Sequence, residues 1–254
     1  MPALHFEKQG TGPVLVLSHA LGCDLHMWDG VAAALAARFT VLRYDHRNHG
    51  RSPLVPGAFS IEDLADDAAA LIRAEAAGPV FFAGVSMGGM TAQALAVRHP
   101  QLLRGIVIAN SSAYYADKAP WQAREARVKA SGVVDIADGA VERWLTPAFR
   151  ATPEGAAQAA ALRATLVATD AAGYIASCNA VAAIDFRDSN RRISVPTLVL
   201  AGSQDLATPP AMSEEIASAI PGAQLQSIDA AHISPAERPA DFARITTLFV
   251  EAHA

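Results

Sequence analysis

The sequence has few cysteines and no excess of basic residues. Only Cys23 and Cys178 occur among its 254 residues, too few for a disulfide framework or a cysteine-based metal cluster, so we expect free thiols in a reducing compartment. Its 20 Lys and Arg are outnumbered by 25 Asp and Glu, for a formal net charge of -5. Without a basic stripe to neutralise phosphates, nucleic acid is not expected as a partner.

Long apolar runs are missing as well. No stretch approaches the roughly 20 apolar residues of a membrane-spanning helix, and the opening M-P-A-L-H-F-E-K lacks the basic start and apolar run of an export signal. We therefore expect a soluble, cytoplasmic protein without membrane association. With 52% hydrophobic residues, the chain is able to bury a large core, as one domain or as a domain with an insertion.

Short apolar runs alternate with segments of helical character along most of the chain. Strands are predicted at 14–18, 40–44, 105–109, 195–201 and 224–228, with one more from residue 80 to a glycine-rich turn at 84–88; residues 4–8 are a candidate edge strand beside 14–18. Helices are predicted at 28–39, 61–76 with Ser60 as its N-cap, 87–99, 210–219 and 240–252. Continuous apolar strands that alternate with helices are typical of a parallel sheet covered on both faces.

The pattern changes between residues 112 and 187. Helices are predicted at 121–131, 138–145 and 153–168, and no convincing strand interrupts them. We interpret 112–187 as a helical cap insertion in a core made of 1–111 and 188–254. Such an insertion is able to lie over the carboxyl ends of the strands, where open α/β sheets bind ligands.

The turn at 84–88 has the sequence Gly84-Val85-Ser86-Met87-Gly88. A G-x-S-x-G pattern between a strand and a helix is typical of a nucleophile elbow, which exposes its serine above the sheet. The pattern alone also fits an ordinary strand-to-helix turn. The apolar strand before it, a further glycine at position 89 and suitable partners downstream favour Ser86 as a nucleophile.

A serine nucleophile needs a base, and the base needs an acid to hold it. His232 follows the last predicted strand, and Asp205 follows the strand before it; both lie where loops leave the carboxyl edge of the sheet. Singly, His232 could be a surface residue and Asp205 a turn residue ahead of Thr208. Asn110 cannot serve as the acid. The chain order Ser86, Asp205, His232 therefore predicts a catalytic triad.

Two backbone amides are candidates for an oxyanion hole. The N–H of Met87 opens the helix behind the nucleophile, and the N–H of Leu21 lies in the loop that follows strand 14–18. We interpret His19, in the same loop, as a structural residue that fixes it.

Several other side chains have either a chemical or a structural interpretation. His46 and His49 lack the H-E-x-x-H form of a metal site, and Cys178 lacks an elbow, so we expect no metal, no cofactor and no cysteine nucleophile. The candidates for substrate binding lie in the cap and are Trp144, Phe149, Arg124 and Arg143. The two aromatic side chains either pack the core of the cap or face a cleft. The two arginines are either solvated or point into the pocket, where they would suit a substrate carboxylate.

Several segments resemble the α/β-hydrolase superfamily and, within it, the 3-oxoadipate enol-lactonases of aromatic-compound breakdown. They are 17–28, 42–50, 84–90, 143–149, 201–210 and 230–232, of which 24–28 and the cap segment at Trp144 are similar to the lactonases in particular. The sequence departs from that family at Asn48 and at Ser234-Pro235, which affects the expected substrate more than the chemistry.

The resemblance implies an α/β-hydrolase fold with a mostly parallel sheet of seven or eight strands. It implies a cofactor-free hydrolase that opens a small enol-lactone carrying a carboxylate. With Ser86 as nucleophile we expect the reaction to pass through an acyl-enzyme, and we expect a monomer or small homo-oligomer. Two alternatives within the superfamily are a general carboxylesterase and a C–C bond hydrolase. An alternative of another class is a ligand-sensing receptor that keeps the triad.

Overall fold

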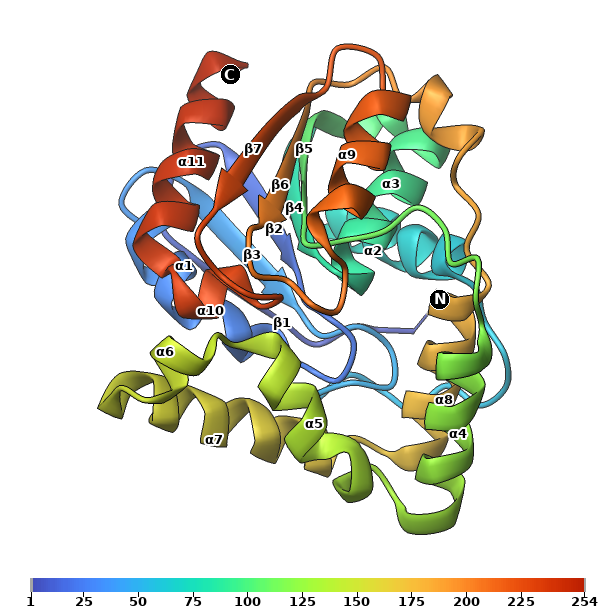
Figure 1. Ribbon diagram of the computed structural model, residues 1–254. Helices are drawn as coiled ribbons and strands as arrows, with labels where there is room; N and C mark the ends of the chain where they lie inside the picture. The colour runs from blue at the N-terminus through green and yellow to red at the C-terminus, as the bar shows by residue number, and fades with distance from the viewer. Residues whose placement is uncertain (1, 254) are drawn as a thin grey trace.

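A seven-stranded sheet forms the centre of the computed structural model, which describes residues 2–253 (Figure 1). The strand order is β1-β3-β2-β4-β5-β6-β7, with β1 antiparallel and the others parallel. The strands are β1 (Phe6–Gln9), β2 (Val14–Ser18), β3 (Thr40–Tyr44), β4 (Val80–Val85), β5 (Leu103–Ala109), β6 (Thr197–Gly202) and β7 (Gln224–Ile228). The α/β-hydrolase fold expected from the sequence is confirmed.

The edge strand β1 pairs differently from the expectation. It lies antiparallel to β3, with Phe6 opposite Tyr44, and not beside β2. Both edges of β2 are already taken, because β3 and β4 flank it in parallel. The short connection at residues 10–13 therefore carries the chain past the neighbouring strand rather than into a hairpin.

Helices cover both faces of the sheet. In Figure 1, α1 and α11 pack together on one face, and α2, α3 and α9 lie on the other. Their bounds are α1 (Asp29–Leu35), α2 (Ile61–Glu75), α3 (Met87–Arg98), α9 (Pro210–Ala219) and α11 (Pro239–Ala252), with a short α10 (Ser234–Glu237) and 3-10 turns at Leu25–Trp28, Pro100–Leu102 and Ser189–Arg192. Helix α2 begins where predicted, because Ser60 and Asp63 form a capping box. The predicted helix 28–39 is shorter and is preceded by the first 3-10 turn.

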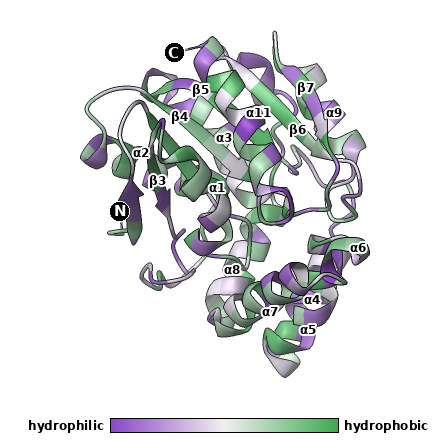
Figure 2. Ribbon diagram, turned by 90° about the vertical axis from the view of Figure 1, so that its left-hand side faces the viewer, coloured by the Kyte–Doolittle hydropathy of each residue, from purple (hydrophilic) through white to green (hydrophobic). Residues whose placement is uncertain are grey.

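Five helices lie between β5 and β6, and we call residues 119–182 the cap. They are α4 (Ala119–Ser131), α5 (Val134–Trp144), α6 (Pro147–Arg150), α7 (Pro153–Ala168) and α8 (Ala171–Ala182). Figures 1 and 2 show them as a layer beyond the carboxyl ends of the strands. The chain enters and leaves this layer at a bridge between Tyr114 and Asp185. The division into domains at 112 and 187 stays a prediction.

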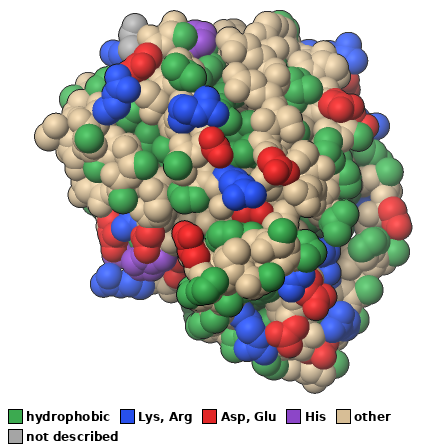
Figure 3. All heavy atoms as spheres, turned by 60° about the vertical axis from the view of Figure 1, so that its left-hand side comes forward, with side chains coloured by type: hydrophobic (Ala, Val, Ile, Leu, Met, Phe, Trp, Pro, Cys, Tyr) green, Lys and Arg blue, Asp and Glu red, His purple; other side chains and the backbone are tan. Residues whose placement is uncertain are grey.

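The core lies between the sheet and its helices, whereas the surface is mixed in character. Figure 2 shows hydrophobic residues concentrated in the central strands, which are buried along their length. On the face in Figure 3, acidic and basic side chains are interspersed. Within residues 2–253, no helix is long and apolar enough to cross a membrane.

Candidate active site

Ser86 occupies a strained turn between β4 and α3. Its backbone has φ 56° and ψ -116°, a region that side-chain-bearing residues rarely adopt and that stores strain. The turn is possible because glycines lie two residues before and two residues after Ser86. A Cβ on Gly84 would lie 2.1 Å from the carbonyl oxygen of Gly88, and one on Gly88 would lie 2.1 Å from that of Ser18. This is the geometry of a nucleophile elbow.

Backbone contacts on both sides hold Ser86 in place. Its amide donates to the carbonyl of Ala109 at the end of β5 over 3.0 Å. Its carbonyl accepts from the amide of Met90 at 2.9 Å and from the hydroxyl of Ser111 at 2.8 Å. The strained turn is thus tied to both the helix behind it and the neighbouring strand.

Asp205 and His232, the predicted acid and base, are buried beside one another. Nδ1 of His232 lies 2.8 Å from Oδ2 of Asp205. The other carboxylate oxygen accepts from the amides of Ala207 and Thr208, at 2.8 and 2.9 Å. Burial raises the pKa of Asp205, but the attraction of His232, its hydrogen bond and the Thr208 amide outweigh burial and leave it below the usual value. The carboxylate is therefore ionised at neutral pH and able to orient the imidazole.

Asn110 contributes a contact that sequence reasoning missed. Its Nδ2 donates to Oδ2 of Asp205 at 3.1 Å, and its Oδ1 accepts from the hydroxyl of Ser234 at 2.6 Å. The residue has a positive φ of 47°, which asparagine tolerates better than most residues. The sequence shows only that Asn110 cannot be the acid of the triad. Ser234, noted there as a departure from the family, also joins the network around Asp205.

Two buried histidine rings hold the loop of the proposed oxyanion hole. Nε2 of His19 accepts from the amide of His46 at 2.9 Å, and Nε2 of His49 accepts from the amide of Gly22 at 3.1 Å. Burial lowers the pKa of His19 to about 4 and that of His49 to about 3, so both rings are neutral acceptors. Within residues 2–253, no group of three His, Cys, Asp or Glu is arranged to hold a metal ion.

The two amides chosen as oxyanion donors are free to face a ligand. Among the contacts of residues 2–253, neither the Leu21 nor the Met87 amide donates a hydrogen bond. Leu21 lines the same cavity as Ser86. The amide of Met87 opens α3, so the positive end of that helix dipole faces the same place. Their role as an oxyanion hole stays a prediction.

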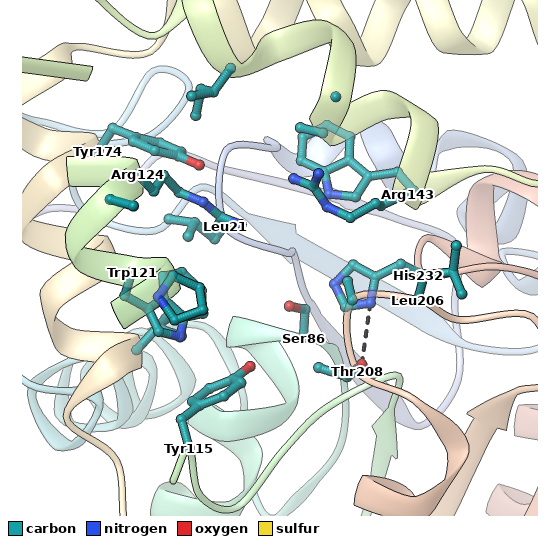
Figure 4. Close-up of a pocket in the computed structure, with 18 of the residues that line it drawn as sticks. Leu21, Ser86, Tyr115, Trp121, Arg124, Arg143, Tyr174, Leu206, Thr208 and His232 are labelled. Carbon is teal, nitrogen blue, oxygen red and sulfur yellow. Dashed lines mark hydrogen bonds between the residues drawn. The ribbon is translucent and has the colours of Figure 1, made fainter. Parts of the chain in front are cut away.

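A cavity of about 520 Å³ lies between the cap and the carboxyl ends of the strands. Figure 4 shows Ser86 and His232 near one another on one side of it, with Arg124 and Arg143 reaching in from opposite walls. Neither arginine has an ion-pair partner within the described chain. By contrast, Arg127, which also lines the cavity, pairs with Asp135 at 2.7 Å.

The two free arginines make this end of the cavity positive. Burial and the neighbouring Arg124 lower the pKa of Arg143, which reflects a charge that lacks a partner. The guanidinium of Arg124 stacks over the Trp121 ring at 4.6 Å from its centroid. An anionic group in the cavity would be attracted to both side chains.

The remaining expected site residues divide between the cavity and the interior. Trp144 lines the cavity, whereas Phe149 does not and lies buried in α6. Phe149 is therefore left out of the binding site. Tyr115 and Tyr174 line the cavity without having been expected to, because neither belongs to a motif. The Cys178 thiol is buried, which raises its pKa to about 11 and makes it a poor nucleophile.

A family model of the alpha/beta hydrolase fold matches residues 13–239. The chain belongs to the α/β-hydrolase family. It is 36% identical over 258 residues to 3-oxoadipate enol-lactonase 2 of Acinetobacter baylyi, covering 95% of this chain and 96% of that protein. The α/β-hydrolase core expected from the elbow is thus shared along nearly the whole length.

Solved structures of an enol-lactonase and of an esterase are similar in fold to this α/β hydrolase. The enol-lactonase from Burkholderia xenovorans LB400 superimposes with a TM-score of 0.93 at 36% identity, covering 98% of this chain and 96% of that one. A thermophilic esterase from Thermogutta terrifontis, solved with malate bound, gives a TM-score of 0.90 at 30% identity, covering 99% and 94%. The protein is therefore an ester-hydrolysing enzyme of this family that acts on a small molecule.

Proposed function

We propose that this α/β hydrolase opens a small enol-lactone that carries a carboxylate. The expected substrate is 3-oxoadipate enol-lactone, an intermediate of aromatic-compound breakdown, and the product is 3-oxoadipate. The observation that carries the proposal is a shared cavity: Ser86 and His232 line it together with the unpaired Arg124 and Arg143. Nucleophile, base and carboxylate-binding groups would thus meet one small molecule.

In the proposed reaction, Ser86 Oγ bonds to the lactone carbonyl carbon while Nε2 of His232 takes the hydroxyl proton. Asp205 holds the ring at Nδ1 and stabilises its positive charge. The amides of Leu21 and Met87 stabilise the oxyanion. The ring C–O bond then breaks, and the enolate oxygen takes the proton from His232, which leaves an acyl chain on Ser86.

Water completes the cycle. His232 takes a proton from water, the hydroxide attacks the acyl carbon, and Ser86 leaves with the proton returned by His232. The freed enol becomes a ketone. No cofactor is needed, because the leaving enolate is a weaker base than a simple alkoxide and the ring opens at one carbonyl.

Two arguments support a carboxylate-bearing substrate. Arg124 and Arg143 face the cavity without carboxylate partners in the described chain, and each guanidinium is able to bind a carboxylate in two parallel hydrogen bonds. A cavity of about 520 Å³ is of the size that small-molecule sites have. The similarity to two enol-lactonases agrees with this choice.

The test measures the ultraviolet absorbance of freshly generated 3-oxoadipate enol-lactone mixed with purified protein. We expect rapid loss of the lactone, slow cleavage of p-nitrophenyl acetate and no turnover by a folded Ser86→Ala variant. A fully active Ser86→Ala variant would end the proposed mechanism. An untouched lactone would end the proposed substrate.

A general carboxylesterase is the second candidate, favoured by the structural similarity to the Thermogutta terrifontis esterase. The two candidates differ in how they treat a masked carboxylate. Methylation of the substrate carboxylate should strongly reduce the rate of a lactonase that uses Arg124 or Arg143. A carboxylesterase would cleave the masked and free compounds at similar rates.

A further inference from the structure

Glu237 is a buried carboxylate beside the proposed active site that has no cationic partner within the described chain. It ends α10 and is 3% exposed. Its Oε2 accepts the backbone amides of Thr146 and Ala231, both at 3.1 Å, and its Oε1 accepts the hydroxyl of Thr146. Hydrogen bonds alone therefore satisfy the polar atoms of this buried side chain, whose burial without partners would be costly.

These hydrogen bonds join the cap to the loop of the base. Thr146 follows α5 of the cap, and Ala231 directly precedes His232. On the other side of the base, the amide of Ile233 donates to the carbonyl of Trp144 at 2.9 Å. The backbone after His232 is thus bonded to the cap directly, and the backbone before it is linked to the cap through Glu237.

The same cap segment reaches the substrate cavity. Trp144 lines the cavity with its side chain while its carbonyl holds the backbone after His232. A shift of the cap relative to the loop would therefore move the wall of the cavity and the base against each other. Glu237 opposes such a shift, because one of its oxygens binds both segments at once.

We propose that Glu237 is a positioning residue that aligns His232 with the cap wall of the cavity. The proposal rests on the proposed roles of Ser86 and His232 as nucleophile and base. Glu237 does not touch the substrate in this scheme; it acts through the backbone of residue 231. Removing it would leave two buried amides without an acceptor and break the link between Ala231 and the cap, while the bond of Ile233 to Trp144 remains.

Replacing Glu237 with glutamine or with alanine distinguishes a positioning role of its oxygens from a role of its charge. Glu237→Gln retains one oxygen able to accept both amides, whereas Glu237→Ala retains none. A misplacement of about 1 Å in a catalytic group costs on the order of a hundredfold in rate. We expect Glu237→Ala to react about tenfold to a hundredfold more slowly than the parent protein, and Glu237→Gln to stay within about threefold.

The experiment measures the rate at which a fluorophosphonate labels Ser86, because this reaction reports the activated serine whatever the natural substrate is. Hydrolysis of the enol-lactone is followed in parallel, and thermal unfolding is measured for every variant. Val250→Ala, a change to a buried residue of α11 away from the cavity, is the control for lost stability. Thr146→Val, which removes one of the three hydrogen bonds to Glu237 and also the N-cap of α6, is the second variant and should give an intermediate slowing.

The outcomes separate this inference from the proposed function. Slow labelling of Glu237→Ala with near-normal labelling of Glu237→Gln and Val250→Ala supports the positioning role. Equal labelling rates for all folded variants and the parent overturn it while the serine hydrolase stands. Slowing of Val250→Ala to the same extent also overturns it, because lost stability would then explain the effect. A parent protein that is neither labelled nor active on the lactone overturns the proposed function, and the positioning role with it.

Discussion

The backbone amide of Gly22 donates a hydrogen bond to Nε2 of His49 over 3.1 Å. The other ring nitrogen of His49 lies 3.1 Å from the carbonyl of Arg47, so it carries the proton. The bond to Gly22 therefore requires a neutral ring. Gly22 follows Leu21, one of the two amides proposed for the oxyanion hole, and a neutral histidine thus holds that loop.

This requirement predicts a loss of stability in acid. The ordinary pKa of histidine is about 6.5, and burial lowers it to about 4 for His19 and about 3 for His49. Above pH 6.5 both the folded and unfolded chains leave these groups neutral. Below it, the unfolded chain takes up protons that the folded chain does not, so the free energy of unfolding should fall by up to about 1.4 kcal/mol per pH unit for each histidine.

Urea unfolding between pH 8 and pH 4.5 measures this effect. His49→Gln should show a shallower decline below pH 6.5, because one buried group no longer titrates. Replacement of the exposed His26 by glutamine is the control and should preserve the slope of the parent protein. A free energy of unfolding that stays constant from pH 7 to pH 5 would contradict the prediction.

From the close packing of the elbow we expect a glycine substitution there to lower the free energy of unfolding. An added Cβ at Gly88 would lie 2.1 Å from the Ser18 carbonyl oxygen, a contact with backbone that cannot move aside without shifting β2. Gly88→Ala should therefore lower the free energy of unfolding by about 3 kcal/mol or more and displace Ser86. Gly78→Ala is the matched control, because nothing lies within 4 Å of its added Cβ. Urea unfolding of both variants checks this, and equal stabilities would refute the steric argument.

If Arg124 and Arg143 bind the substrate carboxylate, we expect their substitution to weaken substrate binding. Arg143→Met should raise the KM for a carboxylate-bearing lactone by about tenfold or more while leaving kcat for p-nitrophenyl acetate near normal, because the lost hydrogen bonds are to a charged group. Arg124→Met should do the same. Arg127→Met is the control, since Arg127 lines the cavity but is already paired with Asp135. Steady-state kinetics on both substrates decide the matter: a KM unchanged in both variants would exclude the arginines from carboxylate binding.

Much of the sheet could be predicted from the sequence because its strands are buried apolar runs. Residues 40–44 and 224–228 begin and end as predicted, and the Ser60 cap set the start of α2. The cap was harder to predict. Helices α6 and α8 were missed because α6 is a single turn and α8 is apolar on most sides, with no periodic polar face to mark it.

In the candidate site, too, some residues could be predicted from the sequence and others could not. Ser86, Asp205 and His232 follow strands, and their positions in chain order were enough to choose them. Glu237 and Asn110 were missed because their partners are distant in the chain: Glu237 binds Thr146 across 91 residues, and Asn110 binds Asp205 across 95. Such contacts depend on how the sheet edge and the cap come together, and no local pattern marks them.

Asn110 predicts a last outcome, in the pH dependence of catalysis. Its Nδ2 donates to Oδ2 of Asp205 at 3.1 Å, so Asn110→Asp would set a second carboxylate against the first. A second carboxylate at this distance raises the pKa of Asp205, because two neighbouring negative charges disfavour each other. The acidic limb of the kcat profile should therefore move to higher pH, by about one unit.

The profile of kcat against pH from 4.5 to 8.5, with p-nitrophenyl acetate or the lactone, measures this shift. The substituted backbone remains compatible, because aspartate tolerates the positive φ of 47° at position 110 nearly as well as asparagine does. Asn179→Asp makes the same change in charge on the exposed side of α8 and should leave the midpoint in place. An acidic limb that does not move in Asn110→Asp would mean that protonation of Asp205 does not control the activity of His232 as the base. A limb that moves in both variants would assign the effect to net charge, whereas a shift confined to Asn110→Asp ties it to the contact with Asp205.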